Sequence, residues 1–418
     1  MHMNMRGISI RQAKPVDEPM VVRAWQTAYG SDFRFKYPER WDWMFRENPF
    51  LRKVSDGLPI WIAANREKAV AWNGSMEVRL QLNHETYPAA FSVDTFTLPE
   101  YRGKKLALHL EEMIQNSHHI YMSIEMAPAV RAILSTLGEK PGKPLNVYLK
   151  LIKKFHGNNL YDDLAGGVQA RFGRTCAALL KILGPYGLER LLNNTVSALF
   201  KLRQKRRHVC HGRDEALGEL SYERVSSFGT ETDRFWLRIK GGYALAVPRD
   251  SEYLNWKYIR QPHLNYTRVL VRREDEVCGL IVYRTGGDSA APLGIICECL
   301  PDNNDPVLFA HMLTHVEKEL ISAGVHMIKC GSSVPGFCNM MQAHGYARIR
   351  TLVPMLYIAP GIRDAIDFDD LRMRDWLLSL GDHDIDQIIT QNQPIFADIL
   401  KILRNAIPGD QDRAEHIL

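Results

Sequence analysis

Residues 91–107 read FSVDTFTLPEYRGKKLA and contain the most informative motif of the chain. Its first part predicts a strand that ends near Leu98, and Leu110, Met113 and Ile114 then recur at helical spacing. Where a strand, a turn and a helix join, the unpaired N–H groups of the first helical turn and the positive end of the helix dipole converge, which suits a pyrophosphate. Glycine permits close backbone approach, and the basic side chains add positive charge. The turn therefore predicts an anion-binding site.

A second feature is that the chain repeats itself. Residues 43–49, WMFRENP, and residues 256–262, WKYIRQP, share the pattern W-x-[FY]-x-x-x-P. After each motif, two apolar runs flank a charged turn, at 59–72 and at 268–283, and such runs predict β-hairpins. A search for internal repeats comes first in any fold assignment, and ordered matches of this kind favour a duplicated domain.

The later parts of the two copies also match. Proline opens and glycine closes a short amphipathic helix at 128–138 and again at 335–345. A final strand is expected at 145–152 in the first copy and at 352–358 in the second. Each copy then reads helix, hairpin, long strand, helix, strand, helix, strand. We predict an α+β (mixed α/β) fold with two tandem domains, each a mixed and largely antiparallel sheet flanked by helices.

The predicted organisation has four parts. These are an N-terminal domain with the anion-binding turn (1–154), a helical basic insert (155–212), a degenerate second copy (213–362) and a C-terminal extension (363–418). A length of 418 residues supports this division, because single hydrophobic cores usually stop growing near 250 residues.

Residues 99–107, PEYRGKKLA, resemble the motif [QR]-x-x-G-x-[GA] of the GNAT (Gcn5-related N-acetyltransferase) family. The resemblance implies acetyl-CoA as co-substrate, with its pyrophosphate on the loop backbone, and direct acetyl transfer to a primary amine. The residues implied in coenzyme binding are Phe96 and Thr97 as backbone donors, then Arg102, Gly103, Lys104, Lys105, Leu106 and Ala107. Lys105 departs from the pattern, since the family usually has glycine there. We expect a loop that still binds through its N–H groups.

The corresponding turn of the second copy, residues 301–307, reads PDNNDPV. It has two aspartates, no basic residue and no glycine, so it should repel a pyrophosphate. The sequence therefore predicts one acetyl-CoA per chain, bound by the first copy.

Three residues are candidates for the chemistry. Transfer needs a base for the amine and a proton source for the leaving thiolate. The fold implied by the resemblance places Asp94 and Glu125 near the splayed strands as alternative bases, although Asp94 could instead hold a neighbouring strand and Glu125 could face solvent. Leu134 stands where many relatives have a tyrosine acid, so Tyr121 or water is the expected proton source.

A looser resemblance covers more of the chain. Residues 250–258 and 375–384 are similar to segments of tandem GNAT-like proteins associated with bacterial surface-polysaccharide pathways. This implies an amino group of a nucleotide-linked or lipid-linked sugar as acceptor. Two other functions stay open: a FemX-like transferase that uses aminoacyl-tRNA, and a non-catalytic GNAT-like binding protein.

Composition limits the partners. The formal charge is +5, and no run of about 18 uncharged apolar residues occurs. Seven cysteines, an odd number, fit reduced thiols and a cytoplasmic protein. Cys297 and Cys299 lack a second pair at zinc spacing and are expected on a buried strand, so no metal is predicted. Residues 188–207 predict a basic amphipathic helix, which could contact a membrane or pack on its own domains. We do not expect nucleic acid as a partner, and the oligomeric state is not predicted.

Overall fold

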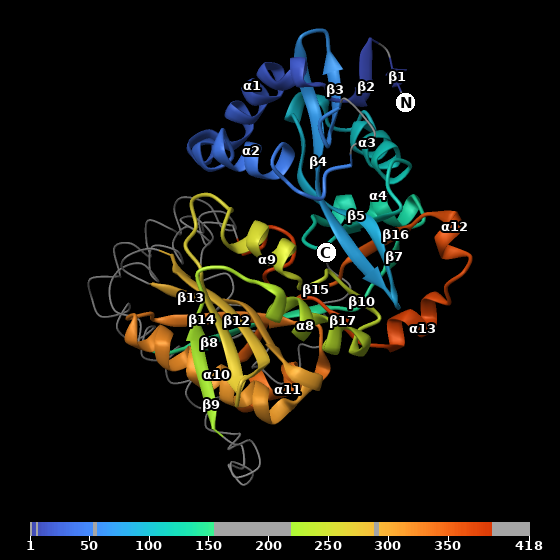
Figure 1. Cartoon of the computed structure of the whole chain (residues 1–418). Coiled ribbons are helices and arrows are strands. Elements are labelled where there is room, and N and C mark those ends of the chain that lie inside the picture. Colours follow the sequence, from blue (N-terminus) through green and yellow to red (C-terminus); the bar gives the residue numbers. More distant parts are fainter. Residues whose placement is uncertain (1, 6, 53–56, 154–218, 288–291, 387–418) are drawn as a thin grey trace, which may run out of the picture.

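The computed structural model describes residues 2–5, 7–52, 57–153, 219–287 and 292–386. These residues form two mixed sheets flanked by helices, which confirms the predicted fold class (Figure 1). The expected insert at 155–212, with its basic helix at 188–207, lies outside the described residues. In the part of the chain that is described, no helix is long and apolar enough to cross a membrane.

The first sheet is built mainly by the N-terminal half. Its strands follow the order β1-β2-β3-β4-β5-β6-β16-β7, with β10 paired to β4 and β17 paired to β10. Their bounds are β1 His2–Met5, β2 Ile8–Gln12, β3 Ile60–Asn65, β4 Lys68–Leu82, β5 Glu85–Thr97, β6 Ile120–Ser123, β7 Lys140–Pro141, β10 Leu245–Ala246, β16 Met355–Ile358 and β17 Trp376–Leu377. The helices of this half are α1 Glu18–Tyr29, α2 Glu39–Phe45, α3 Leu106–Gln115 and α4 Pro128–Thr136.

Helices cover both faces of the first sheet, as two neighbouring residues of β4 show. The ring of Trp72 stacks on Phe96, whose own ring lies 6.4 Å from that of Tyr29 on α1. The next residue, Asn73, points the other way and donates a hydrogen bond of 2.8 Å to Glu111 on α3. Because successive strand side chains point to opposite faces, α1 and α3 lie on opposite sides of the sheet.

The second sheet follows the order β15-β8-β14-β13-β12-β11-β9. Its strands are β8 Leu145–Leu151, β9 Leu220–Arg224, β11 Thr267–Arg273, β12 Glu276–Gly286, β13 Leu293–Pro301, β14 Met327–Ser332 and β15 Ala347–Leu352. The helices of this half are α8 Thr230–Ile239, α9 Ser251–Tyr258, α10 Pro306–Ser322 and α11 Pro335–Ala343, and the chain continues through α12 Pro360–Arg363 and α13 Phe368–Met373.

Several local predictions are confirmed. The two hairpins form as β3–β4 and β11–β12. The two proline-to-glycine helices form as α4 and α11, and each is followed by its glycine, Gly138 or Gly345, at a φ of 85°. Cys297 and Cys299 lie on β13, as expected.

The two halves exchange a strand, which the sequence did not indicate. Strand β8 precedes the insert, yet it pairs antiparallel with β14 and β15 in the second sheet. Strand β16 belongs to the second half of the chain, yet it pairs antiparallel with β6 and β7 in the first sheet (Figure 1). The first sheet also contains the short strands β10 and β17 of the second half, so each sheet includes strands from both halves and neither half completes its sheet alone.

The two W-x-[FY] motifs meet in the interior between the sheets. The rings of Trp43 on α2 and Trp256 on α9 stack with centroids 4.7 Å apart and an interplanar angle of 11°. The indole N–H of Trp43 donates to the Trp256 carbonyl at 3.0 Å, and that of Trp256 donates to the Trp43 carbonyl at 3.3 Å. Such reciprocal contacts are those of an approximate two-fold relation between α2 and α9.

Candidate functional site

Strands β5 and β6 separate at the centre of the first sheet. They pair in parallel over only three residues, 89–91 with 120–122, while β5 continues to Thr97. The register of β5 with β4 shifts just beyond this point, and Asp94 has a left-handed backbone with a φ of 55°. A bulge of this kind bends a strand and redirects its side chains, so β5 leaves β6 and presents an open backbone edge.

This open edge offers hydrogen-bond donors. The amide of Leu98 donates to Val70 on β4 at 3.0 Å. Since backbone groups alternate in direction along a strand, the N–H of Thr97 points away from β4, into the opening, while that of Phe96 points toward β4. The carbonyl of Thr97 faces the loop, where it accepts a hydrogen bond of 3.3 Å from the Arg102 guanidinium.

A tight turn leads from β5 into α3. The turn contains Gly103 at a φ of 78°, and Lys105 at a φ of 60° occupies the N-cap position of α3. Left-handed backbone favours glycine, which explains why glycine is usual in the family at the position of Lys105. No side chain of the described residues caps this helix, so the first-turn N–H groups, at Leu106 and Ala107, lack a side-chain acceptor.

Positive charge surrounds the turn. Arg102, Lys104 and Lys105 are all exposed, and none has an ion-pair partner among the described residues. The Lys104 ammonium lies 4.4 Å from the centroid of the Tyr101 ring. A Cβ added at Gly103 would meet no atom within 4 Å, so this side of the turn is open. Uncapped N–H groups and three free cations suit an anionic ligand.

The equivalent turn of the second half differs in its charges. The carboxylate of Asp305, the N-cap of α10, accepts hydrogen bonds from Val307 at 2.8 Å and Leu308 at 3.3 Å. Asp302 forms an ion pair of 3.1 Å with Arg238. The N-terminus of α10 thus already holds an anion of its own chain, and a nearby cation of the turn, Arg238, is paired with Asp302.

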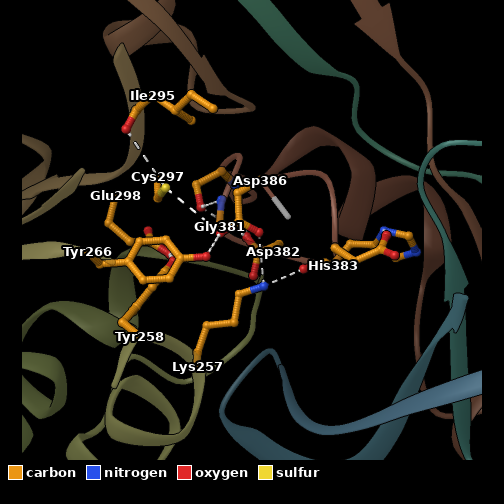
Figure 2. A network of polar contacts seen from close by, with 12 residues as sticks. Lys257, Tyr258, Tyr266, Ile295, Cys297, Glu298, Gly381, Asp382, His383 and Asp386 are labelled. Atoms are coloured by element: carbon orange, nitrogen blue, oxygen red, sulfur yellow. Dashed lines mark hydrogen bonds and ion pairs between the residues drawn. The ribbon is translucent and has the colours of Figure 1, made fainter. Parts of the chain in front are cut away.

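The opening between β13 and β14 is filled by the chain itself. These strands also pair over only three residues, 293–295 with 327–329. Residues 376–386, which we call the bridging segment, run into the gap: Ser379 forms a β-bridge with Ser332, and the amide of Gly381 donates to the Cys297 carbonyl at 3.2 Å (Figure 2). The cavity that is left there is only about 20 Å³.

Asp94, one of the predicted bases, is buried among cations. Its carboxylate accepts a hydrogen bond of 2.8 Å from Arg40 and a second one from Lys36, and its side chain is 3% exposed. Burial alone would raise the pKa of Asp94, but the positive charges of Arg40 and Lys36 outweigh it, so the pKa lies below its usual value. Asp94 is therefore ionised, and both of its carboxylate oxygens are bound by the cations of Lys36 and Arg40.

Tyr121, the predicted proton source, lies on the α3 face of the sheet. Its hydroxyl accepts a hydrogen bond of 3.3 Å from Asn73, and burial raises its pKa well above the usual value. Burial, together with the nearby Glu139, raises the pKa of Glu111 to about 8. Tyr121 and Glu111 thus stay protonated near neutral pH.

Glu125, the other predicted base, is the most accessible of the three. It follows β6 and forms an ion pair of 2.5 Å with Arg350 on β15, and both side chains are 24% exposed. The two residues line a polar pocket of about 350 Å³ that Arg131 on α4 also borders. The structure thus brings Asp94 and Tyr121 to opposite faces of one sheet and Glu125 to a pocket between the two halves.

Sequence reasoning missed several residues of this region. Arg40 and Lys36 were not considered, and His383 and Asp384 appeared only as part of a segment that resembles tandem GNAT-like proteins. The alternating acids of 382–386, Asp-x-Asp-x-Asp, are the one signal that could have pointed to them. Each acid meets a cation: Asp382 pairs with Arg249, Asp384 with Arg40 and Asp386 with Lys257.

Comparison with known proteins agrees with this geometry. A family model described as an acetyltransferase (GNAT) domain matches residues 9–126. The match contains the turn and α3 and ends just after β6. No curated protein matches the chain.

Solved structures resemble the chain beyond residues 9–126. A GCN5-related N-acetyltransferase from Anabaena variabilis has a TM-score of 0.50 at 10% identity, and the alignment covers 84% of this chain and 72% of that protein. The N-myristoyltransferase of Saccharomyces cerevisiae, solved with bound myristoyl-CoA, also has a TM-score of 0.50 at 10% identity, with 85% and 80% covered. At this identity the likeness concerns the fold.

Proposed function

We propose that this protein is an acyl-CoA-dependent N-acyltransferase that binds one coenzyme per chain, in its GNAT domain. The observation that carries the proposal is the contrast between two equivalent helix N-termini. That of α3 has no side-chain cap and lies among three cations that have no ion-pair partner, as far as the described residues go, and it lies beside an open strand edge. That of α10 is capped by Asp305 and lies beside a gap that the bridging segment fills.

The residues of the turn would hold the coenzyme by its pyrophosphate. The N–H groups of Leu106 and Ala107 would donate to phosphate oxygens, and Arg102, Lys104 and Lys105 would supply the neutralising charge. The open edge of β5 would hold the amide-containing arm, and the Thr97 N–H would donate to the acyl oxygen. We assign Phe96 a packing role through its ring.

The chemistry needs one proton to leave the amine and one to reach the thiolate. The coenzyme supplies an acyl thioester: the bond from acyl carbon to acceptor nitrogen forms, the carbon–sulfur bond breaks, and the thiolate takes up a proton. We propose Glu125 as the base, supported by its exposure beside a polar pocket. The protonated Tyr121 is our candidate donor, and we assign Asp94 to holding the bulge, because its carboxylate is already neutralised by Arg40 and Lys36.

We further propose that the two halves are tandem copies with divided roles. The reciprocal contacts of Trp43 and Trp256 and the exchange of β8 and β16 support this arrangement. The second copy would wall the acceptor pocket, to which it contributes Arg350. We propose an amino sugar of a surface-polysaccharide precursor as acceptor, on the resemblance alone, and a cytoplasmic site of action, which fits the free cysteines of the described chain.

Isothermal titration of the full chain with acetyl-CoA tests the proposal. We expect a stoichiometry of one. Gly103→Val strains a backbone at positive φ and obstructs the turn, and Arg102→Glu reverses a charge, so each should weaken binding at least about tenfold, or 1.4 kcal/mol. A stoichiometry of two, or no binding, would refute the assignment.

The second half offers matched controls for these variants. Gly324 also has a positive φ, of 85°, with no atom within 4 Å of an added Cβ, so Gly324→Val repeats the backbone strain away from the turn. Arg234→Glu repeats the charge reversal on an exposed residue of α8. Both controls should bind acetyl-CoA like the wild type. Screening amino-sugar nucleotides, polyamines and peptides for acetyl-CoA-dependent products would then identify the acceptor.

A further inference from the structure

We propose that His383 and Asp384 are positioning residues, supplied by the bridging segment, that hold the bulge of β5 in the geometry needed for acyl transfer. This inference rests on the proposed function and assigns a task to residues outside the GNAT domain. It also assigns a role to the filled gap between β13 and β14, because this gap holds in place the bridging segment on which the two residues lie.

The bridging segment is locked into the second half by buried charge. Asp382 is 0% exposed and accepts hydrogen bonds from Arg249 at 2.7 Å and from the Ser379 amide at 2.9 Å. Arg249 also lies 3.1 Å from Glu298, which accepts a hydrogen bond of 2.8 Å from Tyr258. Removing either partner would leave an uncompensated charge in the interior, so this anchor strongly favours the observed position of the segment.

Glycine is required at the centre of the anchor. A Cβ at Gly381 would lie 1.8 Å from the Tyr258 hydroxyl and 2.7 Å from the Glu298 carboxylate. The segment therefore approaches these side chains more closely than any other residue would permit.

A second anchor follows directly. Asp386 accepts hydrogen bonds from Lys257 at 3.1 Å and from the Tyr266 hydroxyl at 2.6 Å. The Lys257 ammonium also donates to the backbone carbonyl of His383 at 2.5 Å (Figure 2). The backbone of His383 is thus fixed on both sides, by Asp382 and by Asp386, while Figure 2 shows its imidazole pointing away from this cluster.

The side chain of His383 reaches the first sheet. Its Nε2 donates to the carbonyl of Ser92 at 2.5 Å, and its Nδ1 lies 2.5 Å from the Asp384 carboxylate. Ser92 is the first residue of β5 after the last pair with β6. The Ser92 carbonyl can only accept a hydrogen bond, so Nε2 carries a proton, and the nearby Asp384 carboxylate favours the charged form of the ring. Burial opposes this charge, but Asp384 raises the pKa of His383 above its usual value.

Asp384 extends the hold to the bulge itself. Its second oxygen accepts a hydrogen bond of 2.9 Å from Arg40, whose other nitrogen donates to Asp94 at 2.8 Å. The bridging segment therefore contacts β5 at two points. His383 binds the Ser92 carbonyl directly, and Asp384 contacts the left-handed Asp94 through Arg40. The donor groups of the open edge follow immediately, up to Thr97. A displacement of about 1 Å in such groups can cost about a hundredfold in rate.

The test compares the affinities of acetyl-CoA and CoA, which needs no acceptor. The two ligands differ in the acyl group, so their affinity ratio reports on the backbone donors near it. One such hydrogen bond contributes about 0.5–1.5 kcal/mol, which corresponds to a preference of about two- to tenfold for acetyl-CoA. We expect His383→Leu to lose the preference while its affinity for CoA stays within about twofold of the wild type.

Two further variants sharpen the test. His383→Gln keeps an N–H donor for Ser92 and should recover part of the preference, and Asp384→Asn should reduce it. His315→Leu removes a histidine stacked on Tyr222 in the second half and should change nothing. If His383→Leu fails to fold, the preference of Asp384→Asn for acetyl-CoA over CoA decides whether the positioning role holds.

The outcomes separate the two proposals. Wild-type protein that binds neither ligand refutes the proposed function. Binding of both ligands with a preference that survives His383→Leu and Asp384→Asn refutes the positioning role alone. Loss of the preference with CoA affinity retained supports it.

Discussion

The stacked pair Trp43 and Trp256 provides the most direct test of how the two halves join. Both side chains are almost fully buried, at 2% and 0% exposure. We consider the change of each to leucine, which removes the stack and one indole hydrogen bond while it keeps part of the apolar volume. Truncation of a buried tryptophan to alanine costs about 3–5 kcal/mol. We therefore expect roughly 2–3 kcal/mol of unfolding free energy to be lost in each single variant.

The double variant is the informative one. Each single change destroys the ring stack, but the double change destroys it only once. A stacked aromatic pair contributes about 0.5–1.5 kcal/mol beyond its buried area. Trp43→Leu/Trp256→Leu should therefore lose about 1 kcal/mol less than the sum of the single losses. Urea unfolding followed by far-ultraviolet circular dichroism measures all four proteins without relying on tryptophan fluorescence.

Trp61 supplies the matched control. It is also buried, at 4% exposure, but it lies on β3 with its ring 5.7 Å from that of His118. Trp61→Leu combined with Trp256→Leu should be additive within about 0.5 kcal/mol. Additive losses for Trp43 and Trp256, or equal coupling in both cycles, would show that the two motifs do not meet in solution.

Three further predictions concern single sites. Because burial raises the pKa of Glu111 to about 8, the fold favours its neutral form, so its contribution to stability is complete below about pH 4.5 and is lost as the pH rises to about 8. Glu111→Gln should accordingly flatten the loss of stability between pH 5 and pH 8, by an amount on the order of 4 kcal/mol, and a pH profile unchanged from the wild type in chemical denaturation would contradict this. Lys105→Gly should relieve a left-handed backbone conformation that costs about 1 kcal/mol, so the melting temperature should stay unchanged or rise, and the affinity for acetyl-CoA should stay within about threefold of the wild type. The control Lys104→Gly should not raise the melting temperature. Asp305→Ala should lose about 1 kcal/mol of stability through the N-cap without creating a second coenzyme site, and a calorimetric stoichiometry that rises to two would count against the role of the filled cleft.

Much of the candidate site could be predicted because its parts are close in the chain. The strand, turn and helix of residues 91–107 depend on periodicity and on the local conformations of glycine and proline. The same holds for the hairpins and for α4 and α11. The departure at Lys105 was visible in the sequence as well, but only the backbone, with its φ of 60°, shows that lysine adopts the conformation for which glycine is preferred.

The neighbours of the predicted catalytic residues were decided by tertiary structure alone. The sequence places Asp94 on a strand where a base is expected, yet its ionisation depends on its contact with Arg40. Arg40 is in turn bound by Asp384, which lies 344 residues further along the chain. Nothing local to Asp94 encodes that contact.

The same limit applies to the architecture. Local patterns determined that strands lie near residues 152 and 358, although the single strand expected at 352–358 is the end of β15 followed by β16, and they determined that the two motifs match in sequence. Only the packing decided that β8 and β16 change sheets, that Trp43 and Trp256 stack, and that residues 376–386 fill the second cleft. The physical reason is that hydrophobic periodicity specifies which face of a strand is buried, but not which of two similar sheets buries it. That choice depends on the free energy of contacts between residues far apart in the sequence.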